Sequence, residues 1–141
     1  AEIEPLAYLT GAESRDNYLA RVLPGYPAFH YVNRDLPPTA KIYLLFMGRR
    51  AYYCERDYFH DGGELPGFLL GAVRAAKNPA DIYRQLTKQR LTHLLVREEL
   101  LVRFLRDNLS PAELSIWDGF ASGHLQGLFR SNGYSVVQIH G

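Results

Sequence analysis

The sequence predicts an α/β fold, specifically a three-layer Rossmann-like sandwich with a mostly parallel sheet and antiparallel edge hairpins. Two short apolar runs, residues 41–47 and 92–96, have the composition of strands covered on both faces, which is the habit of parallel sheets. A strong helix start lies between them, and a strand–helix–strand order implies a right-handed parallel crossover. Near the end of the chain, Asn132-Gly133 between two apolar runs predicts a hairpin with a two-residue loop.

Length and composition limit the class of protein. The chain has 141 residues, of which 47% are hydrophobic and 13% aromatic, so we expect a globular domain with its own core. The net charge of +1 argues against a nucleic-acid partner, which would select a clustered basic face. The single cysteine, Cys54, excludes an internal disulfide. We expect residues 1–13 to be an irregular lead-in and residues 14–141 to form one α/β domain.

The first half of the chain is predicted to place its main strand at the centre of the sheet. Ser14 can cap a helix over residues 14–23, and Pro27 suits the first turn of a second helix that ends before Pro37-Pro38. The central strand over residues 41–47 follows, with Phe46 as a core residue. The tip at residues 48–50 is expected to turn the chain back into an antiparallel edge strand over residues 51–54. Residues 55–78 carry loop signals, and only a short helix over residues 68–76 is expected there.

The second half of the chain has clearer helix signals. Asn78-Pro79 with Asp81 predicts a capped helix start, and Ser110 with Glu113 predicts a capping box. Between these two helix starts, we expect the buried strand that holds Leu94 and then a helix over residues 98–106. The residues expected to face inward from the helices are Ile82, Tyr83, Leu86, Leu101, Phe104, Leu105, Leu114, Trp117 and Ala121. In the closing hairpin, the two-residue loop is expected to pair Phe129 with Val136 and Leu128 with Val137.

A search for catalytic, nucleotide and metal motifs predicts no catalytic residue and no cofactor. The turn after the central strand lacks the three-glycine spacing of dinucleotide folds, and no P-loop or nucleophile elbow is present. An oxygen-rich metal site from Asp57, His60, Asp61 and Glu64 is one interpretation of the loop, but a solvated acidic loop is the more frequent case. We therefore expect no metal. His93 lies in a buried strand, where a hydrogen-bonded structural histidine is expected.

One surface group suggests ligand binding, and it consists of Arg49, Arg50, Tyr52, Arg56 and Tyr58. Guanidinium groups suit phosphate oxygens, and aromatic rings suit a sugar face or a lipid headgroup region. The competing interpretation is that the arginines are solvated and the tyrosines are half-buried packing residues. This second interpretation is the commoner one at a hairpin tip.

Four segments taken together resemble a known family. The first consists of Tyr18-Leu19-Ala20-Arg21, Leu23-Pro24-Gly25-Tyr26, Asn33 and Leu36-Pro37-Pro38-Thr39-Ala40-Lys41-Ile42. The others are Gly48-Arg49-Arg50-Ala51-Tyr52-Tyr53 with Arg56-Asp57-Tyr58, Leu91-Thr92-His93-Leu94-Leu95-Val96, and Asn132-Gly133-Tyr134-Ser135-Val136. The pattern resembles the soluble C-terminal domain of bacterial polytopic membrane glycosyltransferases, a group similar to the dolichyl-phosphate-mannose protein mannosyltransferases and the aminoarabinose transferases. The resemblance covers residues 14–139 except for residues 55–78. Cys54 departs from the aliphatic residue expected at its position, which affects local packing alone.

The resemblance implies a non-catalytic exocytoplasmic domain of an integral membrane glycosyltransferase that uses a polyprenyl-phosphate sugar donor. The catalytic acids of such enzymes lie in an early loop between membrane helices, so the chain by itself is expected to be inactive. The implied partners are the membrane portion of the same polypeptide and the polyprenyl-phosphate sugar headgroup. The implied location is the periplasmic or extracellular side, with the membrane anchor in a missing N-terminal part, since the chain begins without methionine. Two alternatives stay open: a stand-alone binding module for a phosphorylated or glycosidic ligand, and a small independent α/β enzyme.

Overall fold

A computed structural model describes residues 24–61 and 66–141, which are built around a mixed sheet. The sheet has five strands in the order β2-β1-β3-β5-β4. Both neighbours of β1 run parallel to it, whereas β5 runs antiparallel to β3 and pairs with β4 as a hairpin. The strands are β1 (Lys41–Leu45), β2 (Asp57–Phe59), β3 (His93–Arg97), β4 (Leu125–Ser131) and β5 (Tyr134–Ile139). The predicted parallel pairing of the two buried strands and the predicted hairpin at one edge are therefore confirmed.

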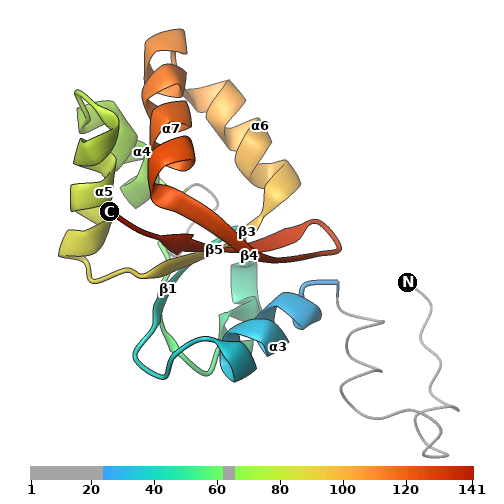
Figure 1. Cartoon of the computed structure of the whole chain (residues 1–141). Helices are drawn as coiled ribbons and strands as arrows, with labels where there is room; N and C mark the ends of the chain where they lie inside the picture. The colour runs from blue at the N-terminus through green and yellow to red at the C-terminus, as the bar shows by residue number, and fades with distance from the viewer. Residues whose placement is uncertain (1–23, 62–65) are drawn as a thin grey trace, which may run out of the picture.

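Helices lie on both sides of the sheet in this part of the chain. Figure 1 shows α4, α5, α6 and α7 on one side of the strands and α3 on the other. The α-helices are α3 (Tyr26–Asp35), α4 (Gly67–Ala75), α5 (Pro79–Lys88), α6 (Glu98–Asn108) and α7 (Pro111–His124). The described residues thus form a mixed α/β fold with an open sheet, and the finer assignment to a three-layer Rossmann-like sandwich stays a prediction. The expectations for residues 1–13 and for a helix over residues 14–23 lie outside the described residues.

The predicted antiparallel return strand over residues 51–54 is wrong. A 3-10 helix, η1 (Gly48–Tyr53), occupies this segment, and the edge strand is β2, which runs parallel to β1. The reason is the backbone after Leu45: Phe46 has φ 66° and Gly48 has φ 58°, so the chain leaves the extended conformation before it can form a hairpin. The strand consequently ends at Leu45, and Phe46 is only half-buried instead of being a strand residue in the core.

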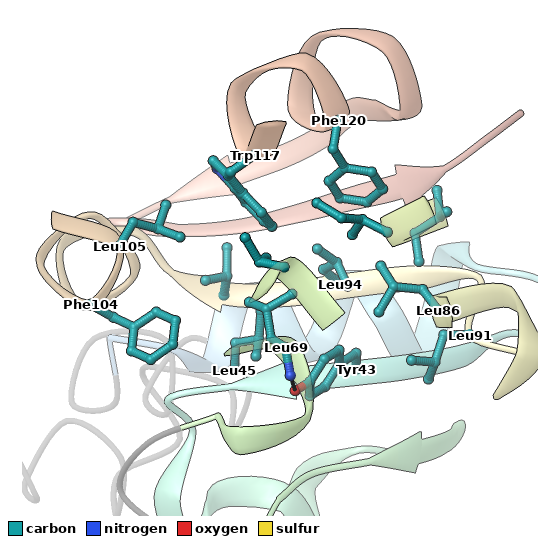
Figure 2. Close-up of a cluster of buried hydrophobic side chains, with 14 of the residues drawn as sticks. Tyr43, Leu45, Leu69, Leu86, Leu91, Leu94, Phe104, Leu105, Trp117 and Phe120 are labelled. Carbon is teal, nitrogen blue, oxygen red and sulfur yellow. Dashed lines mark hydrogen bonds between the residues drawn. The ribbon is translucent and has the colours of Figure 1, made fainter. Parts of the chain in front are cut away.

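Two core clusters cover the two faces of the sheet. The large core cluster, on the side of α4 to α7, consists of Tyr43, Leu45, Leu69, Val73, Ile82, Leu86, Leu91, Leu94, Val96, Phe104, Leu105, Leu109, Trp117, Phe120 and Ile139 (Figure 2). The small core cluster, on the side of α3, consists of Ala28, Phe29, Val32, Leu36, Ala40, Ile42, Leu44, Met47, Ala51, Leu95, Tyr134 and Val136. Alternate residues of β1 and β3 enter alternate clusters, because successive side chains of a strand point to opposite faces. This double coverage explains why both strands are almost continuously apolar.

The helix starts predicted from the sequence are confirmed in atomic detail. The Asn78 side chain accepts a hydrogen bond from the backbone N–H of Asp81 at 3.1 Å, with Pro79 in the first turn of α5. Ser110 and Glu113 form a reciprocal capping box at the start of α7. Of the residues expected to face inward, Ile82 and Leu86 are fully buried, Phe104, Leu105 and Trp117 are buried, and the partly buried ones are Tyr83, Leu101, Leu114 and Ala121. Phe120, which was not among them, is also fully buried.

The closing hairpin has the predicted turn but a shifted register. Asn132 has φ 54° and Gly133 has φ 80°, as a two-residue turn of the primed type requires. Phe129 faces Val136 as predicted, but Gly127 rather than Leu128 pairs with Val137, which leaves Leu128 as the extra residue of a β-bulge. The prediction for Leu128 was therefore wrong. The bulge lets Leu128 and Phe129 both pack against the small core cluster, where the Phe129 ring stacks on Tyr31 of α3.

Candidate functional site

The carboxyl ends of β1 and β3 form the topological switch point of the sheet. The chain leaves β1 through η1, which packs on the α3 face, to reach β2 on one side. It leaves β3 through α6, which packs on the opposite face. In open α/β sheets, ligands bind outside the carboxyl ends of the strands at the point where such connections diverge. A ligand site in this fold is therefore expected at this edge of the sheet.

The structure places the predicted ligand-binding residues at different edges. Arg50 lies in η1 at the carboxyl edge of β1, and its Nη1 donates a hydrogen bond to the Tyr134 hydroxyl at 2.6 Å. Arg56 lies at the opposite edge, where Nη2 donates to the Leu36 carbonyl at 2.8 Å and Nε donates to the Pro37 carbonyl at 3.1 Å. Arg50 and Arg56 are thus separated by the length of β1. They do not share one site.

The remaining members of the predicted group show no further contact that would place them in one site with Arg50 within the described residues. Tyr58 lies in the edge strand β2, is 39% exposed, and stacks on His60 with ring centroids 5.8 Å apart. The side chains of Arg49 and Tyr52 lie outside the described part of the structure. Ligand binding by the group of Arg49, Arg50, Tyr52, Arg56 and Tyr58 consequently stays a prediction.

Two residues at the carboxyl edge, Arg97 and Tyr134, were not predicted as site residues from the sequence. Arg97 is the last residue of β3 and pairs directly with Tyr134 of β5. Arg97 and Leu95 lie on the same face of β3 because they are two residues apart, and Leu95 belongs to the small core cluster with Tyr134. Arg97 is exposed. Its position at the end of a buried strand was the available sequence signal, but the pairing with Tyr134 depends on a register that local patterns do not contain.

A polar cluster on the other face of the same edge fixes α6 to the hairpin. Arg130 Nε lies 2.8 Å from Glu98 Oε2 and 3.0 Å from Oε1, and Arg130 Nη2 lies 2.9 Å from Oε1. Ser135 also donates a hydrogen bond to this carboxylate. The hydrogen bonds from Arg130, and then that from Ser135, lower the pKa of Glu98 below its usual value. This carboxylate is therefore engaged with partners on the large-cluster side of the sheet.

A buried hydroxyl connects β1 to the start of α4. Tyr43 donates to Asp61 Oδ1 at 2.9 Å, and its oxygen accepts a hydrogen bond from the backbone N–H of Leu69 at 3.1 Å. Asp61 Oδ2 accepts a further hydrogen bond from the backbone N–H of Phe68 at 2.5 Å. Burial, followed by the nearby Asp61 carboxylate, raises the pKa of Tyr43 far above its usual value. The cluster has the contacts of a structural support for α4.

His93 has the environment predicted for a structural histidine. Its ring is buried, its Nδ1 lies 2.7 Å from the Thr92 hydroxyl, and burial lowers its pKa. Within the described residues, no group of three histidine, cysteine or acidic side chains has an arrangement that could hold a metal ion. Glu64, one member of the metal interpretation, lies outside those residues, and Asp61 bonds to Tyr43 and α4 as above. No helix in this part of the chain has the length and apolar character needed to cross a membrane.

An open groove of about 640 Å³ lies between α4 and α5. Its floor contains small residues such as Ala72 and Ala76, and its rim carries Lys77, Arg84 and Lys88. Arg84 forms an ion pair with Asp81, whose other oxygen accepts a hydrogen bond from the Lys77 backbone at 2.8 Å. Basic side chains outnumber acidic ones in its lining, and it lies away from the switch point.

Comparison with known proteins identifies a neighbour in fold. No protein-family model matches the chain, and no curated protein matches it. Among solved structures, the chain is similar to the C-terminal globular domain of an oligosaccharyltransferase, AfAglB-S2, from Archaeoglobus fulgidus, with a TM-score of 0.52 and 13% sequence identity. The similarity covers 90% of this chain and 98% of that one. At this identity the likeness establishes a shared fold.

Proposed function

We propose that this chain is a globular accessory domain of a membrane glycosyltransferase. The observation that carries the proposal is the fold: the similarity extends over 98% of the C-terminal globular domain of an oligosaccharyltransferase. The turn and strand motifs of the sequence resemble C-terminal domains of membrane glycosyltransferases, although of a bacterial group. Two independent comparisons, one of motifs and one of backbone geometry, therefore support the same class of parent protein.

The finer features of the proposal come from the resemblance in sequence. The parent enzyme belongs to the group of the dolichyl-phosphate-mannose protein mannosyltransferases and aminoarabinose transferases, and it uses a polyprenyl-phosphate sugar donor. The domain lies on the periplasmic or extracellular side and caps the membrane portion of the same polypeptide. Chemistry takes place in that membrane portion, and the domain shapes access of acceptor or donor. Arg50, at the carboxyl edge of the sheet, is the best placed of the predicted contacts to the donor headgroup.

The coding sequence of the parent protein provides the first test. We expect about ten or more apolar spans of about 20 residues each upstream of residue 1. The purified chain is then compared with the full-length protein in membranes, using a polyprenyl-phosphate sugar as donor. We expect transfer by the full-length protein and none by the chain. Turnover by the purified chain that is lost on a point substitution within it would contradict the proposal, as would a coding sequence without upstream spans.

A stand-alone binding module for a phosphorylated or glycosidic ligand is the second candidate. The observation that favours it is the pair of arginines at the switch point: Arg50 bonds to the Tyr134 hydroxyl, and Arg97 pairs with Tyr134 in the sheet. This candidate predicts binding without turnover and a coding sequence that lacks membrane spans. The third candidate, an independent α/β enzyme, predicts turnover by the purified chain.

A further inference from the structure

We infer that the carboxyl ends of β1 and β3 form a binding site for a phosphoryl oxoanion. The backbone N–H groups of Met47 and Gly48 and the side chains of Arg50 and Arg97 would supply the contacts. This site differs from the group predicted from the sequence, because it excludes Arg56 and Tyr58 and includes backbone groups and a residue of β3. It does not rest on the proposed function, since every contributing group belongs to the chain itself.

The backbone between β1 and η1 has the alternation that creates an anion-binding concavity. Phe46 has φ 66°, Met47 has φ −90° and ψ −14°, and Gly48 has φ 58°. Consecutive residues of opposite hand turn their successive N–H groups toward one side, which forms the concavity known as a nest. Within the described residues, the N–H groups of Met47 and Gly48 donate no hydrogen bond. A Cβ placed on Gly48 would meet no atom within 4 Å, so space is open beside Gly48.

The left-handed conformation of Phe46 is held in place by packing. A bulky residue rarely adopts a positive φ, and such outliers persist only where the surroundings determine them. The Phe46 ring makes an edge-to-face contact with Phe104 of α6, with ring centroids 5.8 Å apart. The Phe46 ring therefore packs against the large core cluster, and its strained backbone lies just beyond the last paired residue of β1. Strain of this kind is concentrated at ligand sites.

Register places Arg97 between the nest and Tyr134. Leu45 pairs with Val96, so Phe46 follows β1 beside Arg97. Arg97 in turn pairs with Tyr134 on its other side, so the three residues form one row across the end of the sheet. Arg50 reaches the same row, because its Nη1 bonds to the Tyr134 hydroxyl at 2.6 Å. Two arginines and the N–H groups of Met47 and Gly48 thus lie at one edge of the sheet.

The charge of this edge is not neutralised within the described residues. Neither Arg50 nor Arg97 forms an ion pair there. The adjacent carboxylate, Glu98, bonds to Arg130 and to Ser135. Tyr134 and Val136, on either side of Ser135, point into the small core cluster, so Ser135 and Glu98 lie on the opposite face of the sheet. An anion is therefore favoured at this edge, and the fork of each guanidinium matches the spacing of phosphate oxygens.

The ligand class is a phosphoryl group with at least two free oxygens, such as inorganic phosphate or a phosphate monoester. Backbone N–H groups and guanidinium groups are donors only, so the site selects an acceptor of several hydrogen bonds. A soluble phosphate compound and the phosphate of a lipid headgroup share this chemistry. The experiment therefore includes both sources.

The test is a titration of the ¹⁵N-labelled chain with inorganic phosphate at constant ionic strength, followed by NMR. We expect saturable shifts of the Met47 and Gly48 amide signals. Arg97→Ala, at an exposed position, is expected to weaken binding about tenfold or more because it removes a charge-assisted contact. Arg50→Ala serves as the second variant. Arg103→Ala, which removes an exposed α6 arginine that pairs with Glu99, is the matched control and is expected to leave binding unchanged.

The source of the phosphate is decided by co-sedimentation with vesicles of phosphatidylcholine alone and of phosphatidylcholine with phosphatidic acid. Binding to the phosphatidic acid vesicles that requires Arg97 and is displaced by inorganic phosphate supports the inference and identifies a lipid phosphate. Phosphate binding in solution without vesicle binding supports it and identifies a soluble compound. The inference is overturned if inorganic phosphate gives no saturable shifts at Met47 and Gly48 and the phosphatidic acid vesicles bind no more chain than phosphatidylcholine vesicles do. It is also overturned if Arg103→Ala weakens binding as much as Arg97→Ala. Neither result bears on the membrane spans that test the proposed function.

Discussion

Replacing Tyr43 with phenylalanine removes a single hydroxyl from the large core cluster and tests the support of α4. Tyr43 is fully buried, and its hydroxyl donates a hydrogen bond to Asp61 Oδ1. The hydroxyl oxygen also accepts a hydrogen bond from the backbone N–H of Leu69 (Figure 2). Leu69 lies in the first turn of α4, where backbone N–H groups have no partner within the helix. Without the hydroxyl, this buried donor is left unsatisfied. Asp61 keeps its hydrogen bond from the Phe68 backbone.

The expected cost follows from these two hydrogen bonds. A buried donor left without a partner costs about 1–3 kcal/mol, and loss of the hydrogen bond to the Asp61 carboxylate adds to it. The ring is retained, so no large cavity forms and the change in apolar burial is small. We therefore expect Tyr43→Phe to lower the free energy of unfolding by about 2 kcal/mol. In urea denaturation followed by circular dichroism, this corresponds to a midpoint lowered by about 1 M.

Tyr31→Phe is the matched control for this prediction. The Tyr31 ring stacks on Phe129, with centroids 4.8 Å apart, but within the described residues its hydroxyl has no hydrogen-bond partner. The same chemical change there is expected to alter stability by less than about 0.5 kcal/mol. Equal effects of Tyr43→Phe and Tyr31→Phe, or a change below about 0.5 kcal/mol for Tyr43→Phe, would refute the assignment of the hydroxyl as a structural support.

Two further predictions concern the core and the α6 start. Leu94→Ala should lower the free energy of unfolding by about 2–5 kcal/mol, because Leu94 is 1% exposed and its loss would leave a cavity. Val102→Ala, at a residue that is 52% exposed, should change the free energy of unfolding little. A loss below about 1 kcal/mol for Leu94→Ala contradicts the core assignment. Glu98→Gln should destabilise the domain at neutral pH, with Glu99→Gln as its exposed control. Because Arg130 lowers the folded-state pKa of Glu98, its contribution is complete above the usual carboxyl pKa of about 4.3 and is lost as the pH falls through the lower, folded value. Thermal unfolding at several pH values checks this, and a difference between wild type and Glu98→Gln that grows toward acid contradicts it.

Much of the fold could be predicted from the sequence because its signals act over a few residues. A capping side chain bonds to a backbone N–H three positions away, as Asn78 and Ser110 do. The turn at Asn132-Gly133 requires positive φ at two adjacent residues, which this dipeptide tolerates. The parallel pairing of β1 and β3 followed from their unbroken apolar composition and from the helices between them. The caps and the turn needed only residues that are neighbours along the chain, and the pairing of β1 with β3 needed only the order of the elements between them.

The edge of the sheet beyond β1 and the candidate phosphoryl site were decided by tertiary structure. Residues 51–54 resemble a strand locally, but the left-handed backbone at Phe46 and Gly48 turns them into η1, and β2 takes the place beside β1. Arg50 bonds to Tyr134 across 84 positions of sequence, and Arg97 joins them through strand register. Local patterns predicted neither the strand on the other side of β1 nor the register in which distant strands pair. Those are fixed by burial on both faces of the complete sheet, since a shift of one residue would move every core side chain to the wrong face.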